Sequence, residues 1–111
     1  MRILSITAQK PHSTGSGVYL TETVRGFKEL GHTQAVIAGV TREDSVKLPE
    51  GVGFYPVYYN SPELPFPVCG MSDEMPYEST RYRYMKPDMV NKFEAAFGSA
   101  VLRAVKEFRP D

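Results

Sequence analysis

The stretch "QKPHSTGSGVYL", residues 9–20, places glycines and hydroxyl side chains between a short apolar run and a helical pattern. Gly15 and Gly17 have no side chain, so the backbone there can come close to a ligand. A helix that begins at this point adds free N–H groups and the positive end of its dipole. These features predict a phosphate or anion site at Gly15, Ser16 and Gly17. The open alternative is a tight strand-to-helix turn that uses glycine only for its geometry.

Two established nucleotide-binding patterns are not met by this loop. In the dinucleotide pattern G-x-G-x-x-G, Leu20 stands where the third glycine belongs, and no acidic residue is suitably placed at the end of the next apolar run. The phosphate-binding pattern that ends in Gly-Lys-Ser/Thr is also absent. The loop therefore does not indicate a nicotinamide or flavin enzyme.

Three further side chains are candidates for ligand contact. His12 lies in the same loop, and Arg81 and Arg83 alternate with tyrosines in "SDEMPYESTRYRYMKPD". Cations interleaved with aromatic rings can bind sugars, nucleotides or anions, and they can equally anchor a loop to its own domain. His12, His32 and Cys69 lack the spacing of metal ligands, so no metal site is predicted.

Composition limits the class of protein. The chain has 111 residues, enough for one domain with a core, and 13 basic residues balance 13 acidic ones. A net charge of zero argues against binding nucleic acid by bulk phosphate attraction. The single cysteine excludes an internal disulfide and fits a cytoplasmic location. No apolar run approaches the roughly 18 residues that would predict a membrane span.

The periodicity of apolar residues predicts alternating strands and helices. Short apolar runs over 2–8, 33–40 and 52–59 are typical of buried strands. Pro56 predicts that the third of these strands is short or lies at an edge of its sheet. Residues 17–30 carry apolar side chains at helical spacing, and Gly31 suits the left-handed position that ends a helix.

The second half of the chain divides at Asp88. The segment 60–87 is rich in proline and tyrosine and has no regular period, which predicts an ordered, irregular surface excursion with a helical turn. A long amphipathic helix is expected to follow, capped by Asp88 and ended by Pro110.

The first 39 residues, "MRILSITAQKPHSTGSGVYLTETVRGFKELGHTQAVIAG", resemble the start of GT-B fold glycosyltransferases of the large retaining family 4 group. These enzymes open with an "M-[KR]-I-L" strand, a loop containing proline and glycine, a helix that ends "L-x-x-x-G-H", and a strand beginning "x-V-x-V". The corresponding stretches here are "MRIL", "KPHSTGSG", "VRGFKELGH" and "TQAVIAG". The end of the chain, "AVKEFRPD", is similar to the family's helix before an "x-P-D-[IV]-[IV]-H" strand.

The resemblance implies an α/β fold with a partial Rossmann-like, doubly wound parallel sheet, and residues 1–111 as an incomplete N-terminal domain. Such enzymes transfer a sugar from a nucleotide-sugar donor to an acceptor and commonly need no bound metal or other cofactor. Gly15, Ser16 and Gly17 would approach the donor diphosphate, and His12, Arg81 and Arg83 are the candidates for the acceptor side. The family's catalytic residues lie outside this stretch, so it should hold none and be inactive alone.

A stand-alone nucleotide- or anion-binding module is the alternative interpretation. On the glycosyltransferase interpretation, Gly17→Val should impair donor use more than folding. The three strands should lie in the order third, second, first, which leaves residues 2–8 as an unpaired edge. An unpaired apolar edge, or a swapped C-terminal helix, predicts self-association.

Overall fold

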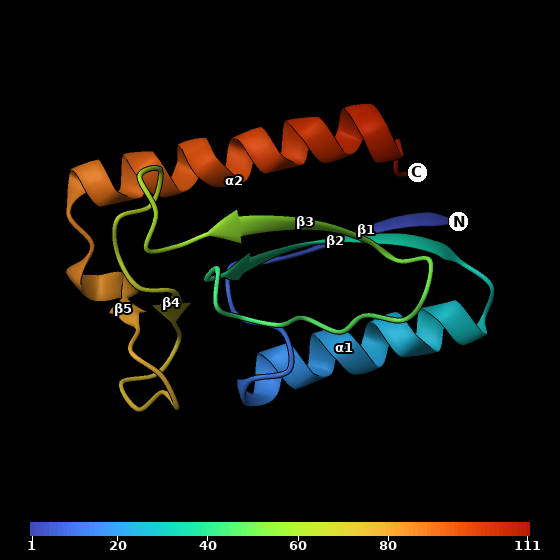
Figure 1. The fold of residues 1–111 in the computed structure, drawn as a ribbon, viewed down its shortest axis with the longest axis horizontal. Helices are drawn as coiled ribbons and strands as arrows, with labels where there is room; N and C mark the ends of the chain where they lie inside the picture. Colours follow the sequence, from blue (N-terminus) through green and yellow to red (C-terminus); the bar gives the residue numbers. More distant parts are fainter.

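A computed structural model describes all 111 residues as three layers, with a parallel sheet between two helices (Figure 1). The sheet has the order β1-β2-β3, so the central strand is the second in sequence. Neither helix combines the length and the apolar character needed to cross a bilayer. The elements are β1 (Arg2–Thr7), α1 (Thr14–Glu29), β2 (Thr33–Val40), β3 (Gly53–Tyr58), β4 (Cys69–Gly70), β5 (Thr80–Arg81), η1 (Tyr82–Tyr84) and α2 (Pro87–Phe108).

The central strand β2 is buried on both faces, as its continuous apolar sequence predicts. Successive side chains of a strand point to opposite faces, and Ile37 joins the core beneath α2 while Val36 and Ala38 join the core beneath α1. The predicted strands and their order are confirmed. Pro56 lies in β3 at one edge of the sheet, and β1 forms the other edge, also as predicted.

Helix α1 begins at Thr14, three residues before the predicted start at Gly17. The prediction assigned Gly15 and Ser16 to the preceding loop, whereas both lie in the first turn of the helix. An added Cβ at Gly17 would lie 2.4 Å from the carbonyl oxygen of Lys10. Gly17 is therefore a helical residue that lets the preceding loop pack against the first turn. The predicted end is confirmed, since Gly31 has a φ of +85°.

Helix α2 is preceded by Lys86 as its capping residue, so the prediction that Asp88 caps it was wrong. Pro87 occupies the start of the helix, where its fixed φ is compatible and its missing N–H costs nothing. Asp88 instead lies in the first turn, where its negative charge complements the helix dipole.

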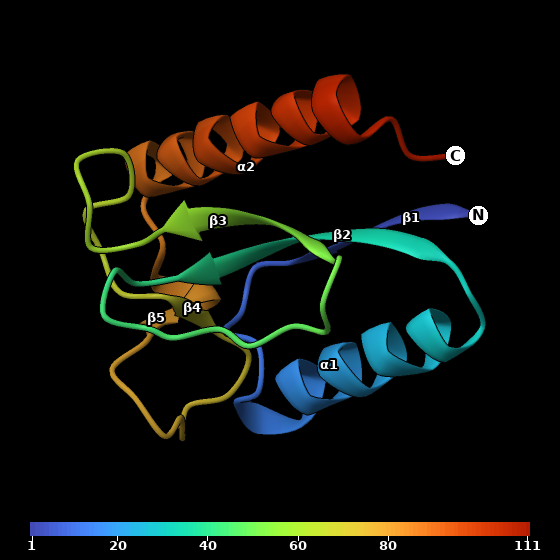
Figure 2. The ribbon, with the colours of Figure 1, turned by 45° about the vertical axis from the view of Figure 1, so that its right-hand side comes forward.

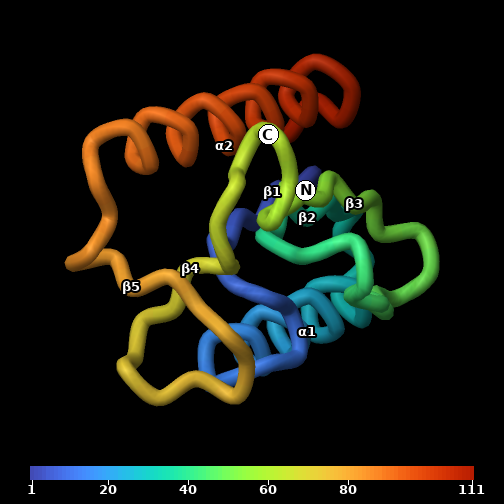
Figure 3. The backbone as a smooth tube through the Cα atoms, turned by 60° about the vertical axis from the view of Figure 1, so that its left-hand side comes forward, coloured from blue at the N-terminus to red at the C-terminus, as the bar shows by residue number.

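The excursion 60–87 leaves the sheet at the carboxyl ends of its strands and returns to the start of α2 (Figures 2 and 3). The expected helical turn is present as η1, accompanied by the two-residue pairing of β4 with β5. The description of this segment as a surface excursion was wrong for its first half, because Leu64 and Cys69 are fully buried and Val68 is nearly so. Single apolar residues between prolines fill the core without any period.

The core is divided unequally between the two faces of the sheet. Beneath α2 it contains ten buried residues, among them Tyr59 and Phe97, whereas beneath α1 it contains three. The excursion accounts for much of the difference, since its buried apolar side chains, Leu64, Phe66, Val68 and Cys69, join the α2 side. The end of the chain returns to the sheet, where Asp111 N–H donates to the carbonyl oxygen of Arg2 over 2.9 Å.

Candidate functional site

A pocket of about 300 Å³ lies where the loops after β1 and β2 meet the excursion. The carboxyl ends of parallel strands share one edge of a sheet, which is where open α/β sheets place their ligands. We call this cavity the strand-end pocket; it is lined by Lys10, Pro11, His12, Ser13, Val40, Asp44, Ser45, Val46, Pro76 and Tyr77.

The charge at the centre of the strand-end pocket is neutralised by an ion pair. Lys10 Nζ lies 3.0 Å from Asp44 Oδ1, and both side chains are largely buried, at 18% and 25% exposure. The same ammonium lies 4.5 Å from the centre of the Tyr77 ring, a cation–π arrangement. The pair ties the loop after β1 to the loop after β2, and Tyr77 joins the excursion to both.

Asp44 is also held by the backbone of its own loop. Burial alone would raise the pKa of its carboxyl group, but hydrogen bonds from Thr41 N–H and the Thr41 hydroxyl, together with the charge of Lys10, bring the pKa below its ordinary value. The Thr41 N–H bond measures 2.7 Å. Asp44 is therefore ionised at neutral pH and is positioned as a structural anion, not as a general acid.

The N-terminus of α1 opens beside this pocket without a side-chain cap. Ser13 precedes the helix, but its hydroxyl donates to the carbonyl oxygen of Lys10 over 2.9 Å and not to the helix. No acidic residue lies in the first turn. Neither a capping side chain nor an acidic residue of the first turn therefore meets the positive end of the helix dipole.

The backbone around this helix start is strained. His12 has a φ of 66° and Thr14 a φ of 58°. Left-handed backbone is uncommon for residues other than glycine, and it is a clear outlier for a β-branched residue such as threonine. Strain of this kind gathers at functional sites, where the surrounding structure holds it in place. The loop between β1 and α1 thus holds two residues other than glycine in left-handed backbone.

The predicted anion-binding residues have three different environments. An added Cβ at Gly15 would meet no atom within 4 Å, so the space outside its backbone is open. Ser16 donates a hydrogen bond from its hydroxyl to Gln9 Oε1. Gly17 is buried against the loop, so the chain itself requires a glycine there. Gly17→Val should therefore disturb folding as well as donor use, so this substitution does not separate the two effects.

Among the predicted acceptor-side residues, the structure places only His12 in the pocket. Arg81 and Arg83 lie elsewhere and share Asp73, with nitrogen–oxygen distances of 3.5 Å and 2.9 Å. Both guanidinium groups also lie over the ring of Tyr84. These contacts are those of a segment anchored to itself, which was the alternative interpretation of its sequence.

Sequence reasoning missed Lys10, Asp44 and Tyr77, which form the centre of the pocket. A usable signal existed for two of them. Lys10 follows the first predicted strand and Asp44 follows the second, and parallel neighbours bring such positions to the same edge. No sequence pattern pointed to Tyr77, because the excursion has no helical or alternating period from which its path could be predicted.

The remaining reactive groups form no second chemical centre. Burial raises the pKa of the Cys69 thiol, although hydrogen bonds with Tyr59 and Tyr82 act in the opposite direction. A buried neutral thiol is a poor nucleophile and metal ligand. No three His, Cys, Asp or Glu side chains gather as a set of metal ligands.

Comparison of the chain with models of protein families and with curated proteins finds no match. A functional proposal therefore depends on the geometry described above and on the sequence patterns.

Proposed function

We propose that this chain forms the N-terminal, acceptor-facing part of a nucleotide-sugar-dependent glycosyltransferase with a Rossmann-like, doubly wound sheet. The observation that supports the proposal most directly is the uncapped N-terminus of α1, which opens beside the strand-end pocket after the loop that follows β1. The sequence from Met1 to His32 carries the family resemblance, and the candidate donor loop lies within it.

A nucleotide diphosphate suits this helix terminus on physical grounds. Backbone N–H groups and the helix dipole stabilise negative charge without requiring a lysine, provided that the backbone can be approached closely. The open space outside Gly15 allows such an approach. Lys10 is already paired with Asp44, so in this proposal it positions the loop and leaves the anion to the backbone.

The topology is compatible with the proposal. Doubly wound sheets place the third, second and first strands side by side, and the order β1-β2-β3 agrees with that arrangement. After α2 the chain reaches the start of β1, where Asp111 and Arg2 exchange two hydrogen bonds of 2.9 Å and 2.8 Å. A strand that continued from this point would begin beside β1.

The test is the activity of the protein expressed from its whole reading frame. It is supplied with a panel of nucleotide sugars and candidate acceptors, and release of nucleoside diphosphate is measured. We expect Gly15→Val to lower kcat/KM for the donor at least about tenfold, because a side chain there blocks the approach of the diphosphate. Thermal unfolding should be unchanged, since the new Cβ meets nothing.

Gly26→Val is the matched control for this substitution. Gly26 lies in the same helix, and an added Cβ there also meets no atom within 4 Å. Equal loss of activity in both variants would contradict a donor site at the helix N-terminus. Binding of nucleotides without turnover by the whole protein would instead support the stand-alone binding module.

A further inference from the structure

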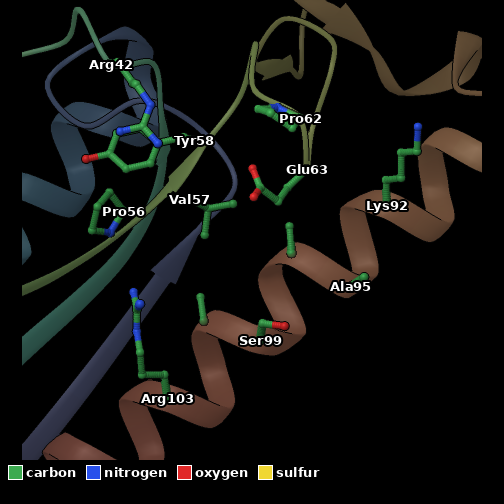
Figure 4. Close-up of a pocket in the computed structure, with 12 residues that line it drawn as sticks. Arg42, Pro56, Val57, Tyr58, Pro62, Glu63, Lys92, Ala95, Ser99 and Arg103 are labelled. Atoms are coloured by element: carbon green, nitrogen blue, oxygen red, sulfur yellow. The ribbon is translucent and has the colours of Figure 1, made fainter.

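A second cavity, of about 610 Å³, lies between the edge strand β3 and helix α2 (Figure 4). It shares no lining residue with the strand-end pocket. We call it the helix–strand groove. Its volume falls within the range of about 300–1,000 Å³ that is usual for small-molecule sites. One wall is Pro56, Val57 and Tyr58 of β3, and the other is the face of α2 from Lys92 to Arg103.

The groove gathers positive charge that the chain leaves unpaired. Arg42, Lys92 and Arg103 line it, and none of them forms an ion pair or a side-chain hydrogen bond within the protein. Glu63 is the only carboxylate in the lining, so the groove carries a net charge of +2. The whole chain has a net charge of zero. This local excess is complementary to a negatively charged occupant.

Two of the cations are held in place by aromatic rings. The guanidinium of Arg42 lies 4.3 Å from the centre of the Tyr58 ring, and that of Arg103 lies 5.6 Å from the centre of the Tyr55 ring. Figure 4 shows Arg42 lying against Tyr58, while Arg103 and Glu63 extend into the space between the strand and the helix. A guanidinium that is already oriented loses less entropy when it binds a phosphate oxygen.

The dimensions of the groove limit the length of its occupant. Lys92 and Arg103 are eleven positions apart on α2, which separates their backbones by about 16 Å along the helix axis. Between them, small side chains such as Ala96 and Ser99 leave the space open. Arg103 extends into this space at one end, whereas Lys92 points away from it (Figure 4). The open stretch between the two positions suits a molecule about as long as a mononucleotide.

An added peptide strand suits this groove less well than a small molecule. An edge strand binds a peptide through its free backbone N–H and C=O groups. Pro56, the first of the three β3 residues in this wall, has no N–H group to donate. The polar side chains present, Ser99 and Glu63, are a hydroxyl and a carboxylate that can hydrogen-bond to sugar hydroxyls.

We propose that the helix–strand groove binds a phosphorylated sugar, either free or as part of a nucleotide. Arg103 contacts the phosphate at one end of the groove, and Ser99 and Glu63 contact the hydroxyl groups. The site is independent of the proposed donor site, because it lies on the α2 side of the sheet and shares none of its residues.

The test is a titration of the ¹⁵N-labelled chain, followed by two-dimensional ¹H–¹⁵N spectra. Ribose 5-phosphate and AMP are the probes, and ribose and adenosine are their unphosphorylated controls. We expect saturable shifts for backbone amides between Ala95 and Ala100 with at least one phosphorylated probe, and none with the controls. Tighter binding of AMP would indicate that the base also contacts the groove, whereas equal affinity would identify the sugar phosphate as the recognised unit.

Substitutions can distinguish specific binding in the groove from nonspecific electrostatic attraction of the probe. Arg103→Gln should weaken binding at least about tenfold, as expected for loss of a charge-assisted contact to phosphate. Ser99→Leu leaves the charge unchanged but fills the groove, and it should weaken binding to a similar extent. Lys106→Gln is the control, because Lys106 is an exposed cation on the same helix outside the groove.

Several outcomes would overturn the proposal. The first is no saturation by either phosphorylated probe up to about 10 mM, the weak end of specific recognition. The second is an unchanged affinity of Ser99→Leu, which would show that only surface charge attracts the probe. The third is equally tight binding of inorganic phosphate. Shifts confined to residues 10–17 would move phosphate binding to the strand-end pocket, refuting the groove while supporting an anion site at α1.

Discussion

The strand-end pocket and the helix–strand groove use their positive charges in opposite ways. In the pocket, Lys10 is largely buried, paired with Asp44 at 3.0 Å and covered by Tyr77. In the groove, Arg42 and Arg103 are exposed, rest on aromatic rings and have no carboxylate partner. The first arrangement holds three loops together, and the second leaves charge available to a ligand.

This difference predicts which charges contribute to the stability of the fold and which contribute to ligand binding. A partly buried pair stabilises the fold because separating it leaves a charge without a partner in a poorly hydrated place. Exposed cations are well hydrated, so their removal costs the fold little. Substitutions in the pocket should therefore change stability, and substitutions in the groove should change affinity alone.

The largest effect on stability is expected from Gly17→Ala. The new Cβ would lie 2.4 Å from the carbonyl oxygen of Lys10, so the loop that carries Lys10 must move away from α1. Overpacking of this kind typically costs about 1–3 kcal/mol of the free energy of unfolding. Gly15→Ala is the control, with open space for its Cβ. Denaturant unfolding of the two variants checks this, and similar stabilities would disprove the close packing of the loop.

A smaller effect is expected from breaking the ion pair of the strand-end pocket. Asp44→Ala removes the partner of Lys10 and the acceptor for Thr41 N–H, which should cost about 1–2 kcal/mol of the free energy of unfolding. Glu22→Ala removes an ion pair on the exposed surface of α1, with both side chains more than half exposed. Its cost should stay within about 0.5 kcal/mol. Equal costs would contradict the structural role of Asp44.

The sequence predicts the regular part of this fold well, because local patterns determine it. The three short apolar runs became β1, β2 and β3, and the glycine after the first helix adopts the expected left-handed conformation. The error at the start of α1 has a specific cause. Gly17 is needed where two backbones meet, and its partner Lys10 is seven positions earlier in a loop. Such a contact leaves no periodic signal.

The candidate sites were less predictable because they join distant segments. The pocket combines Lys10, Asp44 and Tyr77 from three separate loops, and only the first two follow predictable strands. The groove needs both the edge position of β3 and the orientation of α2 before Arg42 and Arg103 can be placed together. Both the strand-end pocket and the helix–strand groove therefore arise from the arrangement of the strands and helices and not from a local sequence motif.

Acid should weaken the strand-end pocket in a defined range of pH. The fold lowers the pKa of Asp44 below its ordinary value, so its contribution to stability is complete well above the pKa of the unfolded chain and is lost as pH falls through the folded pKa. Asp44→Asn resembles the protonated state. The stability gap between wild type and this variant should therefore narrow as pH falls from about 5 to about 2. Unfolding measured along this series checks the sign, and a gap that widened would contradict it.

The smallest change in stability is expected in the groove. Lys92→Gln combined with Arg103→Gln removes two exposed cations without ion-pair partners, so the free energy of unfolding should stay within about 0.5 kcal/mol of wild type. Thermal unfolding without a ligand provides the measurement. A loss as large as that of Asp44→Ala would show that these cations support the packing of α2 on β3. The proposed difference between the two regions, structural charges in the pocket and ligand-binding charges in the groove, would then be disproved.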